Sequence, residues 1–443
     1  MPRTRQSVLA WCLALALTAC QHFEPRPLSP ETTASAFAER NLRDPGLHEF
    51  LKENGASKGT WTPDRLALAA AYFHPDVALA RAEAQVAAAA IETAAMRPNP
   101  LLTFGPQFAS SNISPITPWF LGMNVLIPME TAGKRSKRTE QARLAAEAAR
   151  WRVSARAWAA RSRVRIAMLD LHAARENIRL LEAEQTLHQE ALQKLTAQME
   201  AGDVSPFELT QARLMLDRTR LSWRDAQRNA ATAEARLATA TGIPLPALRE
   251  VPLDFSLFER LPKPEPGQIR GKALTQRADL MALLCDYAAS EAALKLELAR
   301  QYPDLNVVPG YDYNSGQNRW QLGWNFQLPL NRNRGPIAEA AARRLSAEKR
   351  FLAQQEAIEG ELDVALAAYE ASRAKVMTAA QLASQAQTAA ATTRRMVEAG
   401  DISALELTRR KIEASAASIS LMTARIEAQM AVGALEDAMQ STL

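Results

Sequence analysis

Aromatic side chains are scarce in this sequence, and so is glycine. Phe, Trp and Tyr together make up 6% of the 443 residues, and 17 residues are glycine, although 47% are hydrophobic. Alanine, the residue with the highest helix propensity, supplies much of that apolar share. This composition argues against a β-sandwich or a doubly wound sheet and favours long, closely packed helices.

The sequence also lacks the usual marks of enzymes and of nucleic-acid-binding proteins. The five His residues, at positions 22, 48, 74, 172 and 188, have neither metal-ligand nor triad spacing, and no glycine loop could cradle a phosphate. The 53 basic and 48 acidic residues are interspersed, with a formal net charge of +5 and no basic cluster. We therefore predict a protein that is not an enzyme, needs no metal or cofactor, and binds no nucleic acid.

A long apolar run is missing, but a short one lies near the N-terminus. Two arginines precede the apolar segment 8–17, which ends in Leu17-Thr18-Ala19-Cys20. A run this short is typical of a signal peptide, because a membrane-spanning helix needs about 20 residues. Since the ending is similar to a lipobox, we expect residues 1–19 to be a lipoprotein signal peptide and Cys20 to be lipidated. An ordinary secretory signal with an incidental cysteine is the alternative.

Cysteine is otherwise rare. Cys12 would leave with the signal peptide and Cys20 would carry lipid, so Cys285 would stand alone. Neither an intramolecular disulfide nor a cysteine-based metal cluster is then expected. No later segment has 18 consecutive apolar residues, so any further membrane crossing would have to use β-strands.

What the sequence does contain is a duplication with a spacing of roughly 200 residues. Five landmarks match in the same order: His74-Pro75-Asp76-Val77 with Arg277-Ala278-Asp279-Leu280, Pro98-Asn99 with Pro303-Asp304, Gly105 with Gly310, Ile127-Pro128 with Leu328-Pro329, and Ala201-Gly202-Asp203-Val204-Ser205 with Ala399-Gly400-Asp401-Ile402-Ser403. Each repeat is predicted to contain a medium helix, two strands, a very long helix, a tight turn and a further helix.

The long helices are predicted over 134–201 and 337–399. The first has neither Pro nor Gly, and the second has one interior glycine, Gly360. At 1.5 Å per residue the first could be roughly 100 Å long, so it must belong to a coiled-coil-like assembly. The last helix carries two seven-residue apolar seams, starting at Leu405 and Leu407. Two seams indicate neighbours on both sides and favour a ring of helices, with one self-contained antiparallel coiled coil as the alternative.

The turns after the long helices have clear chemistry. Gly202 and Gly400 suit the left-handed position that ends a helix. Ser205-Pro206-Phe207-Glu208 and Ser403-Ala404-Leu405-Glu406 then have the pattern of a capping box. Both turns are therefore predicted to join the arms of short-turned helical hairpins.

Four segments of about nine residues alternate between apolar and polar or small residues, which is the strand period. They are 102–108, 119–127, 305–313 and 319–328. In the last, one face carries Trp320, Leu322, Trp324 and Phe326. This pattern suits a transmembrane barrel with lipid outside and water inside, although a soluble sheet packed on helices would show it too. Because four strands cannot close a barrel, strands in a membrane would require several chains to share one.

Together these motifs resemble the outer-membrane factors of the TolC superfamily, and within it the CzcC-like components of metal efflux pumps. The resemblance covers the whole mature chain and includes both Ala-Gly-Asp turns. Its other motifs are Arg97-Pro98-Asn99-Pro100, Ile127-Pro128, Gly133-Lys134-Arg135, Leu328-Pro329-Leu330 and Asn331-Arg332-Asn333-Arg334-Gly335.

This resemblance implies a mainly α fold with a β-barrel part. Three copies would share one 12-stranded barrel and one long periplasmic α-helical barrel. The implied parts are the signal peptide 1–19, an N-terminal equatorial segment and helix 20–96, a first repeat 97–241, a linker, equatorial segment and helix 242–300, and a second repeat 301–443.

The resemblance also implies a function: a lipid-anchored outer-membrane channel subunit with a large periplasmic portion. A homotrimer would accept solutes from a periplasmic adaptor protein and an inner-membrane pump of the RND type and release them outside. Divalent metal cations are the expected cargo. The alternatives are an exit duct for drug efflux or type I protein secretion, and a periplasmic adaptor or other lipoprotein without a pore.

The implied site residues lie at the turns and on the last strand. The adaptor would meet the periplasmic tips at Gly202, Asp203, Ser205, Gly400, Asp401 and Ser403. Glu208 and Glu406 would line a constriction, but Arg409 stands where a second acid is expected and could pair with Glu406 three residues earlier. The strand face from Trp320 to Phe326 would contact outer-membrane lipid.

Overall fold

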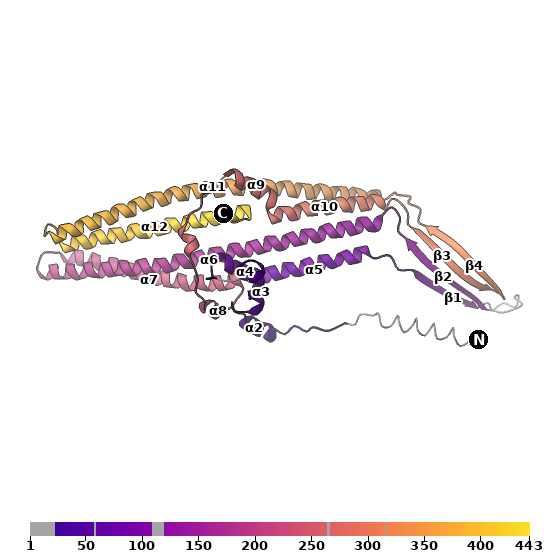
Figure 1. Ribbon diagram of the computed structural model, residues 1–443, viewed down its shortest axis with the longest axis horizontal. Coiled ribbons are helices and arrows are strands. Elements are labelled where there is room, and N and C mark those ends of the chain that lie inside the picture. The colour runs from indigo at the N-terminus through magenta and orange to yellow at the C-terminus, as the bar shows by residue number, and fades with distance from the viewer. Residues whose placement is uncertain (1–22, 57–58, 109–118, 264–265, 315) are drawn as a thin grey trace.

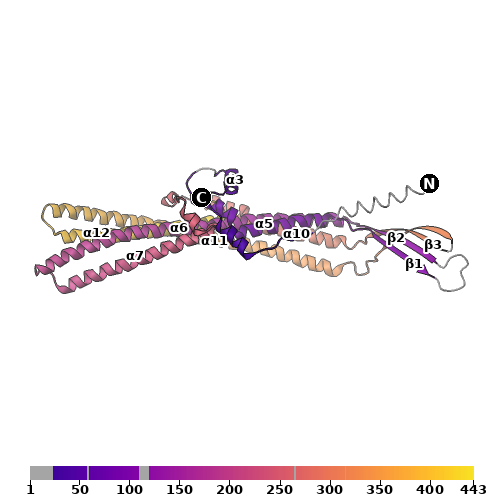
Figure 2. The ribbon, with the colours of Figure 1, turned by 90° about the horizontal axis from the view of Figure 1, so that it is seen from below.

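The computed structural model describes residues 23–56, 59–108, 119–263, 266–314 and 316–443. The expected signal peptide and the expected lipidation site Cys20 lie outside these residues. The molecule is elongated, with a β-sheet at one end and two helical hairpin turns at the other (Figure 1). Short helices gather around the middle of the long axis, and the view turned by 90° shows the same arrangement (Figure 2).

The predicted order of elements recurs twice along the chain. The first repeat contains α5 (Pro75–Ala95), β1 (Leu101–Phe108), β2 (Trp119–Met129), α6 (Lys134–Glu200) and α7 (Pro206–Thr241). The second contains α10 (Ala278–Ala299), β3 (Leu305–Asn314), β4 (Gln317–Phe326), α11 (Arg334–Glu398) and α12 (Ala404–Met439). The remaining elements are α2 (Pro30–Ala38), α3 (Pro45–Glu53), α4 (Pro63–Phe73), α8 (Leu245–Arg249), the 3₁₀ helix η1 (Ser256–Glu259) and α9 (Pro266–Gln276).

The long helix α6 is the centre of the helical layer. It has 67 residues and packs along α5 and α7 of its own repeat and along α10 and α12 of the second. The other long helix, α11, has 65 residues and packs mainly along α10 and α12. The helix α12 therefore lies between two long helices, as its two apolar seams predict.

The largest core lies near the middle of the long axis. There α4, α6 and α7 bury a cluster with the linker after Thr241, including Leu66, Leu171, Leu237 and Leu248. The helices α7 and α5 meet end to end beside α6 at this level. Their junction requires a glycine, because Gly242 has φ +78° and a Cβ there would lie 3.1 Å from the backbone of Phe73.

The four strands form one antiparallel sheet in the order β1-β2-β3-β4. The register pairs apolar with apolar residues across the sheet, as in Phe104 with Met123, Met123 with Tyr311, and Tyr311 with Trp320. The next row pairs polar or small residues, as in Thr103 with Asn124 and Gly310 with Gln321. The predicted alternation is therefore confirmed in these rows, and Leu126 and Val308 are apolar exceptions on the polar face.

Gly310 shows how closely the polar face is packed. The Gln321 side chain on β4 donates a 3.0 Å hydrogen bond to Asn124 on β2, passing over β3 at Gly310. A Cβ at position 310 would overlap the Asn124 Oδ1 atom and lie 2.8 Å from Gln321 Cγ. Glycine at this position leaves room for a hydrogen bond that spans three strands.

Candidate functional site

The two hairpin turns lie side by side at the end of the molecule opposite the sheet (Figures 1 and 2). Gly202 and Gly400 have φ +84° and +85°, the left-handed conformation that the sequence predicts. In both turns the next residue donates back into the helix: Asp203 to Gln198 and Asp401 to Met396, each at 2.9 Å. These bonds satisfy helix-end carbonyl groups and hold the turn in one shape.

Each turn is followed by a capped helix. The Ser205 hydroxyl accepts from the Glu208 N–H at 3.4 Å, and the Ser403 hydroxyl accepts from the Glu406 N–H at 3.3 Å. The predicted serine caps are thus present in both repeats. Between the hairpins, Lys194 of α6 donates to Thr408 of α12 at 2.6 Å, so the two tips are joined within one chain.

The charges at the tips pair differently from the expectation. Glu406 pairs with Arg410, one helical turn on, at 3.0 Å, whereas Arg409 points across to Glu208 on α7 at 3.9 Å. The predicted contact between Glu406 and Arg409 is therefore wrong. The physical reason is that Arg410 lies four residues after Glu406 on the same helix face, while Arg409 faces the neighbouring hairpin. Both candidate constriction acids thus have arginine neighbours.

The sheet face from Trp320 to Phe326 is uncovered. Trp320 is 82% exposed, and Leu322, Trp324 and Phe326 are also exposed, as are Leu102, Phe104 and Phe108 on β1. No helix of the described chain packs on this face, so it does not have the environment of a soluble sheet that rests on helices. The exposed apolar surface is of the kind that contacts lipid or another chain.

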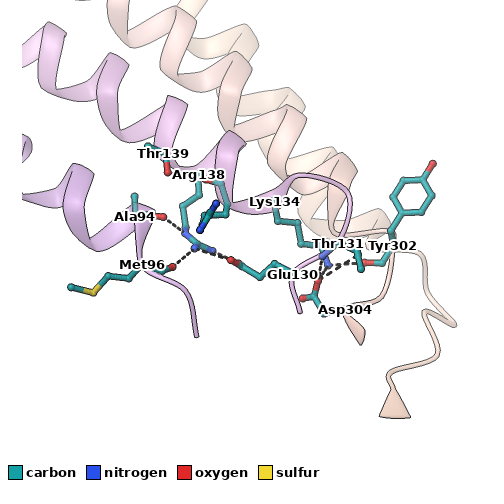
Figure 3. Close-up of polar contacts among 10 residues, drawn as sticks. Ala94, Met96, Glu130, Thr131, Lys134, Arg138, Thr139, Tyr302 and Asp304 are labelled. Atoms are coloured by element: carbon teal, nitrogen blue, oxygen red, sulfur yellow. Dashed lines mark hydrogen bonds and ion pairs between the residues drawn. The ribbon is translucent and has the colours of Figure 1, made fainter. Parts of the chain in front are cut away.

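An ion pair between a buried lysine and a half-buried aspartate joins the two repeats where the sheet meets the helices (Figure 3). Lys134, the first residue of α6, donates to Asp304 before β3 at 2.7 Å and to the Tyr302 carbonyl group at 2.7 Å. The Thr131 N–H donates to the same Asp304 carboxylate at 2.9 Å. Sequence reasoning placed Lys134 and Asp304 in separate motifs and missed their contact.

A second cluster at the same junction fixes the first repeat alone. Arg138 of α6 donates to the Glu130 carboxylate at 2.6 Å and to the carbonyl groups of Ala94 and Met96 at 2.8 and 3.0 Å (Figure 3). These contacts tie the end of α5 and the end of β2 to the start of α6. The sheet is therefore connected to the helices by charged side chains from both repeats.

A buried polar network crosses the middle of the molecule, and it was not predicted. Arg165 of α6 is 4% exposed and donates to the carbonyl and side-chain oxygens of Gln429 on α12 at 2.9 and 3.1 Å. It also lies 3.3 Å from the buried Glu436 carboxylate. Gly433 makes the room, since a Cβ there would overlap the Arg165 guanidinium. A cavity of about 630 Å³ opens beside this network.

His74 caps α5 and should make the stability of the fold depend on pH. Its Nδ1 atom accepts a hydrogen bond from the Asp76 N–H at 3.1 Å, which requires the unprotonated nitrogen. Burial, and then the nearby Arg163 guanidinium, lower the pKa of His74. Because the unfolded chain then binds the proton more tightly, stability should fall as pH falls below about 6.5.

We expect His74→Asn to weaken this pH dependence. Asparagine is a favourable cap with no titrating proton, so the variant should match the unmodified chain near pH 8 and lose less stability towards pH 5. Unfolding midpoints in guanidinium at several pH values measure the effect. Equal slopes for the two proteins between pH 7.5 and 5 would contradict it.

Other kinds of site receive no support within the described ranges. No cluster of three or more His, Cys, Asp or Glu side chains could hold a metal ion among the residues that the structure describes. None of the described helices is both long and apolar enough to cross a bilayer. Cys285 lies half-buried on α10, and burial raises the pKa of its thiol.

Comparison with known proteins gives a consistent result. The model of the outer membrane efflux protein family matches residues 69–243 and 269–439, which together span most of both repeats. The cobalt-zinc-cadmium resistance protein CzcC of Cupriavidus metallidurans is 26% identical over 258 residues, 58% of this chain and 61% of that protein. The alignment thus spans less than two thirds of the relative.

Solved structures share the fold at low sequence identity. The structure of CusC, studied for its folding and transmembrane channel formation, is 19% identical with a TM-score of 0.67 and covers 86% of this chain and 92% of its own. The outer membrane protein VceC of Vibrio cholerae is 18% identical with a TM-score of 0.69, covering 86% and 96%. Most of the chain therefore shares its fold with these two proteins.

Proposed function

The chain belongs to the outer membrane efflux protein family, and we propose that three copies of it form a passive exit channel through the outer membrane. The observation that carries this proposal is the incomplete sheet. Strands β1 and β4 each have a partner on one side only within the described chain, and the apolar face of the sheet is exposed. A sheet edge in lipid leaves backbone N–H and C=O groups without hydrogen bonds, which costs several kcal/mol for each group.

Pairing β4 of one copy with β1 of the next would remove both edges. Four strands are too few for a barrel, since about eight is the usual minimum. Three copies would supply twelve strands in one closed cylinder, a head-to-tail contact that repeats around a threefold axis. The apolar rows, such as Leu102 and Leu322, would then face lipid, and the polar rows would face a water-filled interior.

The helices would continue the cylinder into the periplasm. Each copy would contribute the long helices α6 and α11 and, beside them, the end-to-end pairs α5 with α7 and α10 with α12. The equatorial segments 20–96 and 242–300 would surround this tunnel at its middle. The repeats 97–241 and 301–443 would form its wall, and lipid on Cys20 would anchor it.

The tips are the proposed contact with a periplasmic adaptor protein and, through it, an inner-membrane pump of the RND type. Gly202, Asp203 and Ser205, with Gly400, Asp401 and Ser403, form two fixed turns at the free end of the hairpins. Glu208, Glu406 and Arg409 would line the constriction there. Because arginines neighbour both acids, we expect a constriction without a strong preference for cations.

Divalent metal cations are the proposed cargo. Support comes from the relative CzcC, whose name refers to cobalt, zinc and cadmium resistance. The channel wall, so far as the structure describes it, offers no cluster of metal ligands. Selection among cations would therefore fall to the pump, and the channel would provide a path and no binding step.

Conductance and mass measurements test the proposal. Protein purified in mild detergent should have three times the mass of one chain and should form discrete single channels in planar bilayers. A deletion strain should become sensitive to zinc, cobalt or cadmium, and a panel of lipophilic toxins serves as the comparison. A stable monomer that forms no pores would refute the channel. Sensitivity to the toxins alone would refute the metal cargo.

A further inference from the structure

Within one chain the two repeats meet through one helix contact. The equivalent surface at the outer edge of each repeat is uncovered. Helix α6 packs on α12, but α11, its counterpart, has no first-repeat helix beside it within the described chain. The two repeats can be matched residue by residue near the middle, where each position in α6 corresponds to the one 198 further on, as Gly202 does to Gly400. Buried residues then coincide: Ala160, Val164, Ala167 and Leu171 with Ile358, Leu362, Ala365 and Tyr369.

The exceptions lie on one face. Arg161, Ser162 and Arg165 bond to α12. Their counterparts in α11 are exposed: Glu359, Gly360 and Asp363. The helix α12, which covers this face of α6, differs from its counterpart α7 in the same way. Gln429, Gly433 and Asp437 of α12 are buried or half-buried. The corresponding residues of α7 are exposed: Ala231, Ala235 and Thr239. One chain thus presents two complementary uncovered faces at opposite edges.

The junction with the sheet also has a contact that one repeat makes and the other repeat leaves without a partner. There the contact can be assigned to individual side chains. Ala132 and Gly133 have φ +54° and +67°, and Arg332 and Asn333 have φ +47° and +55°. The Lys134 N–H donates to the Thr131 carbonyl group at 3.2 Å, and the Arg334 N–H donates to the Asn331 carbonyl group at the same distance. Arg334 therefore begins α11 in the backbone geometry with which Lys134 begins α6.

The partner of Arg334 is missing from its own chain. Lys134 reaches Asp304, in the Pro303-Asp304 motif before β3. The matching motif, Pro98-Asn99, precedes β1 at the opposite edge of the sheet from Arg334. The Arg334 side chain is exposed and forms no ion pair with the residues described here.

A groove lies at that opposite edge. Its volume is about 1310 Å³, and it is lined by the segment from Arg97 to Pro100, by the end of β2 and by the first turns of α6 as far as Arg143. Glu140 lines it, is exposed and has no ion-pair partner in the described chain. On the other edge, Leu328 and Leu330 are 66% and 92% exposed beside two arginines, Arg332 and Arg334.

We propose that the segment 328–334 of one copy docks in this groove of a second copy, with the Arg334 guanidinium donating to the Asn99 side chain. The contact repeats the bond between Lys134 and Asp304, with a neutral acceptor in place of the carboxylate. Leu328 and Leu330 lose their exposure to water, and the arginines approach Glu140. The inference rests on the proposed trimer and specifies which residues join its copies.

Chemical crosslinking tests the contact, with an internal control that the duplication supplies. In a Cys285→Ser background, Asn99→Cys with Arg334→Cys should give dimers and trimers on denaturing gels after treatment with a short bis-maleimide. Disulfide formation is a poorer probe, because it needs Cβ atoms about 3.5–4.5 Å apart. The Cβ atoms of a long basic residue and of its hydrogen-bond acceptor lie further apart than that. The matched pair Lys134→Cys with Asp304→Cys should react within one chain and run at the mass of a monomer.

The outcomes separate the two proposals. A trimer in mild detergent that gives no crosslink between copies at positions 99 and 334 overturns the docking contact and leaves the channel standing. A protein that is monomeric in mild detergent overturns both. Crosslinked trimers support both.

A gain of stability provides a second test that does not depend on a disruptive change. Asn99→Asp should create a charge pair with Arg334 at all three contacts and slow dissociation of the trimer about fivefold per contact at low ionic strength, an effect that salt weakens. An Arg334→Gln change in the same protein should remove the gain. Dissociation of Asn99→Asp at an unchanged or faster rate would overturn the assignment of Asn99 as the acceptor.

Discussion

Replacing Leu322 with arginine is expected to prevent the chain from entering the outer membrane as an assembled channel. Leu322 lies near the middle of β4, in an apolar row with Pro309 on β3. An arginine on the lipid face costs about 2–4 kcal/mol near the bilayer midplane, so three copies would raise the cost to about 6–12 kcal/mol. The proposed trimer should disappear from outer-membrane fractions, and its conductance should disappear with it.

The control for this change is Thr103→Arg. The register puts Thr103 on the opposite face and at nearly the same depth, one row from Leu322. That face already carries a charged residue, Arg319, opposite Asp312. Thr103→Arg should therefore assemble normally and alter only conductance or ion preference. If Thr103→Arg failed to assemble while Leu322→Arg assembled normally, the lipid and water faces would have been assigned the wrong way round.

The strands and the turns could be predicted because their signals are local. Alternation in β4 depends on residues two positions apart, and the turn at Gly400 depends on a glycine followed within three residues by a serine cap. Duplication strengthened both signals, since each pattern occurs twice in the same order. Neither prediction required knowledge of which segments meet in space.

The short helices before α5 were missed although the sequence contains a signal for them. Asp44-Pro45 and Thr62-Pro63 each place a capping side chain before a proline in the first helical turn, and both caps are made in the structure. A systematic search for capping residues followed by proline would have found α3 and α4. The segment 20–96 was instead predicted to contain one helix.

The charged contacts between repeats could not be predicted, because their partners are far apart in sequence. Lys134 and Asp304 are 170 positions apart, and Arg165 and Gln429 are 264 apart. Local periodicity says which face of a helix is buried but not which helix covers it. The contact between Arg409 and Glu208 could not be predicted for the same reason, since it depends on how closely the two hairpins approach each other.

The sequence contained one weak signal for the buried polar network around Arg165. Gln429 and Glu436 are seven residues apart, each next to an apolar seam position, and Gly433 lies between them in a helix with no other glycine. A glycine inside a long helix lowers its stability by about 1 kcal/mol relative to alanine, so it calls for a packing reason. That reason is the Arg165 side chain, which occupies the space a Cβ would fill.

We expect Glu436→Gln to be among the most destabilising single changes in this chain. The variant keeps the shape of the side chain but leaves the Arg165 guanidinium buried without the carboxylate 3.3 Å away. Arg161 also loses one of its two charged partners and keeps only Asp64. Breaking a buried ion pair by removing one partner costs about 3–5 kcal/mol, because the remaining charge stays desolvated. The guanidinium midpoint of the purified protein measures the loss.

Two further variants show whether burial is the cause. Glu427→Gln removes an ion pair with Lys375 that also joins two helices but is about half exposed, and it should cost less than about 1 kcal/mol. Arg165→Met combined with Glu436→Leu removes both buried charges, and this double change should recover most of the stability that Glu436→Gln loses. Equal losses for Glu436→Gln and Glu427→Gln would mean that the network contributes no more than a surface pair. In that case the junction between the repeats would depend on apolar packing alone.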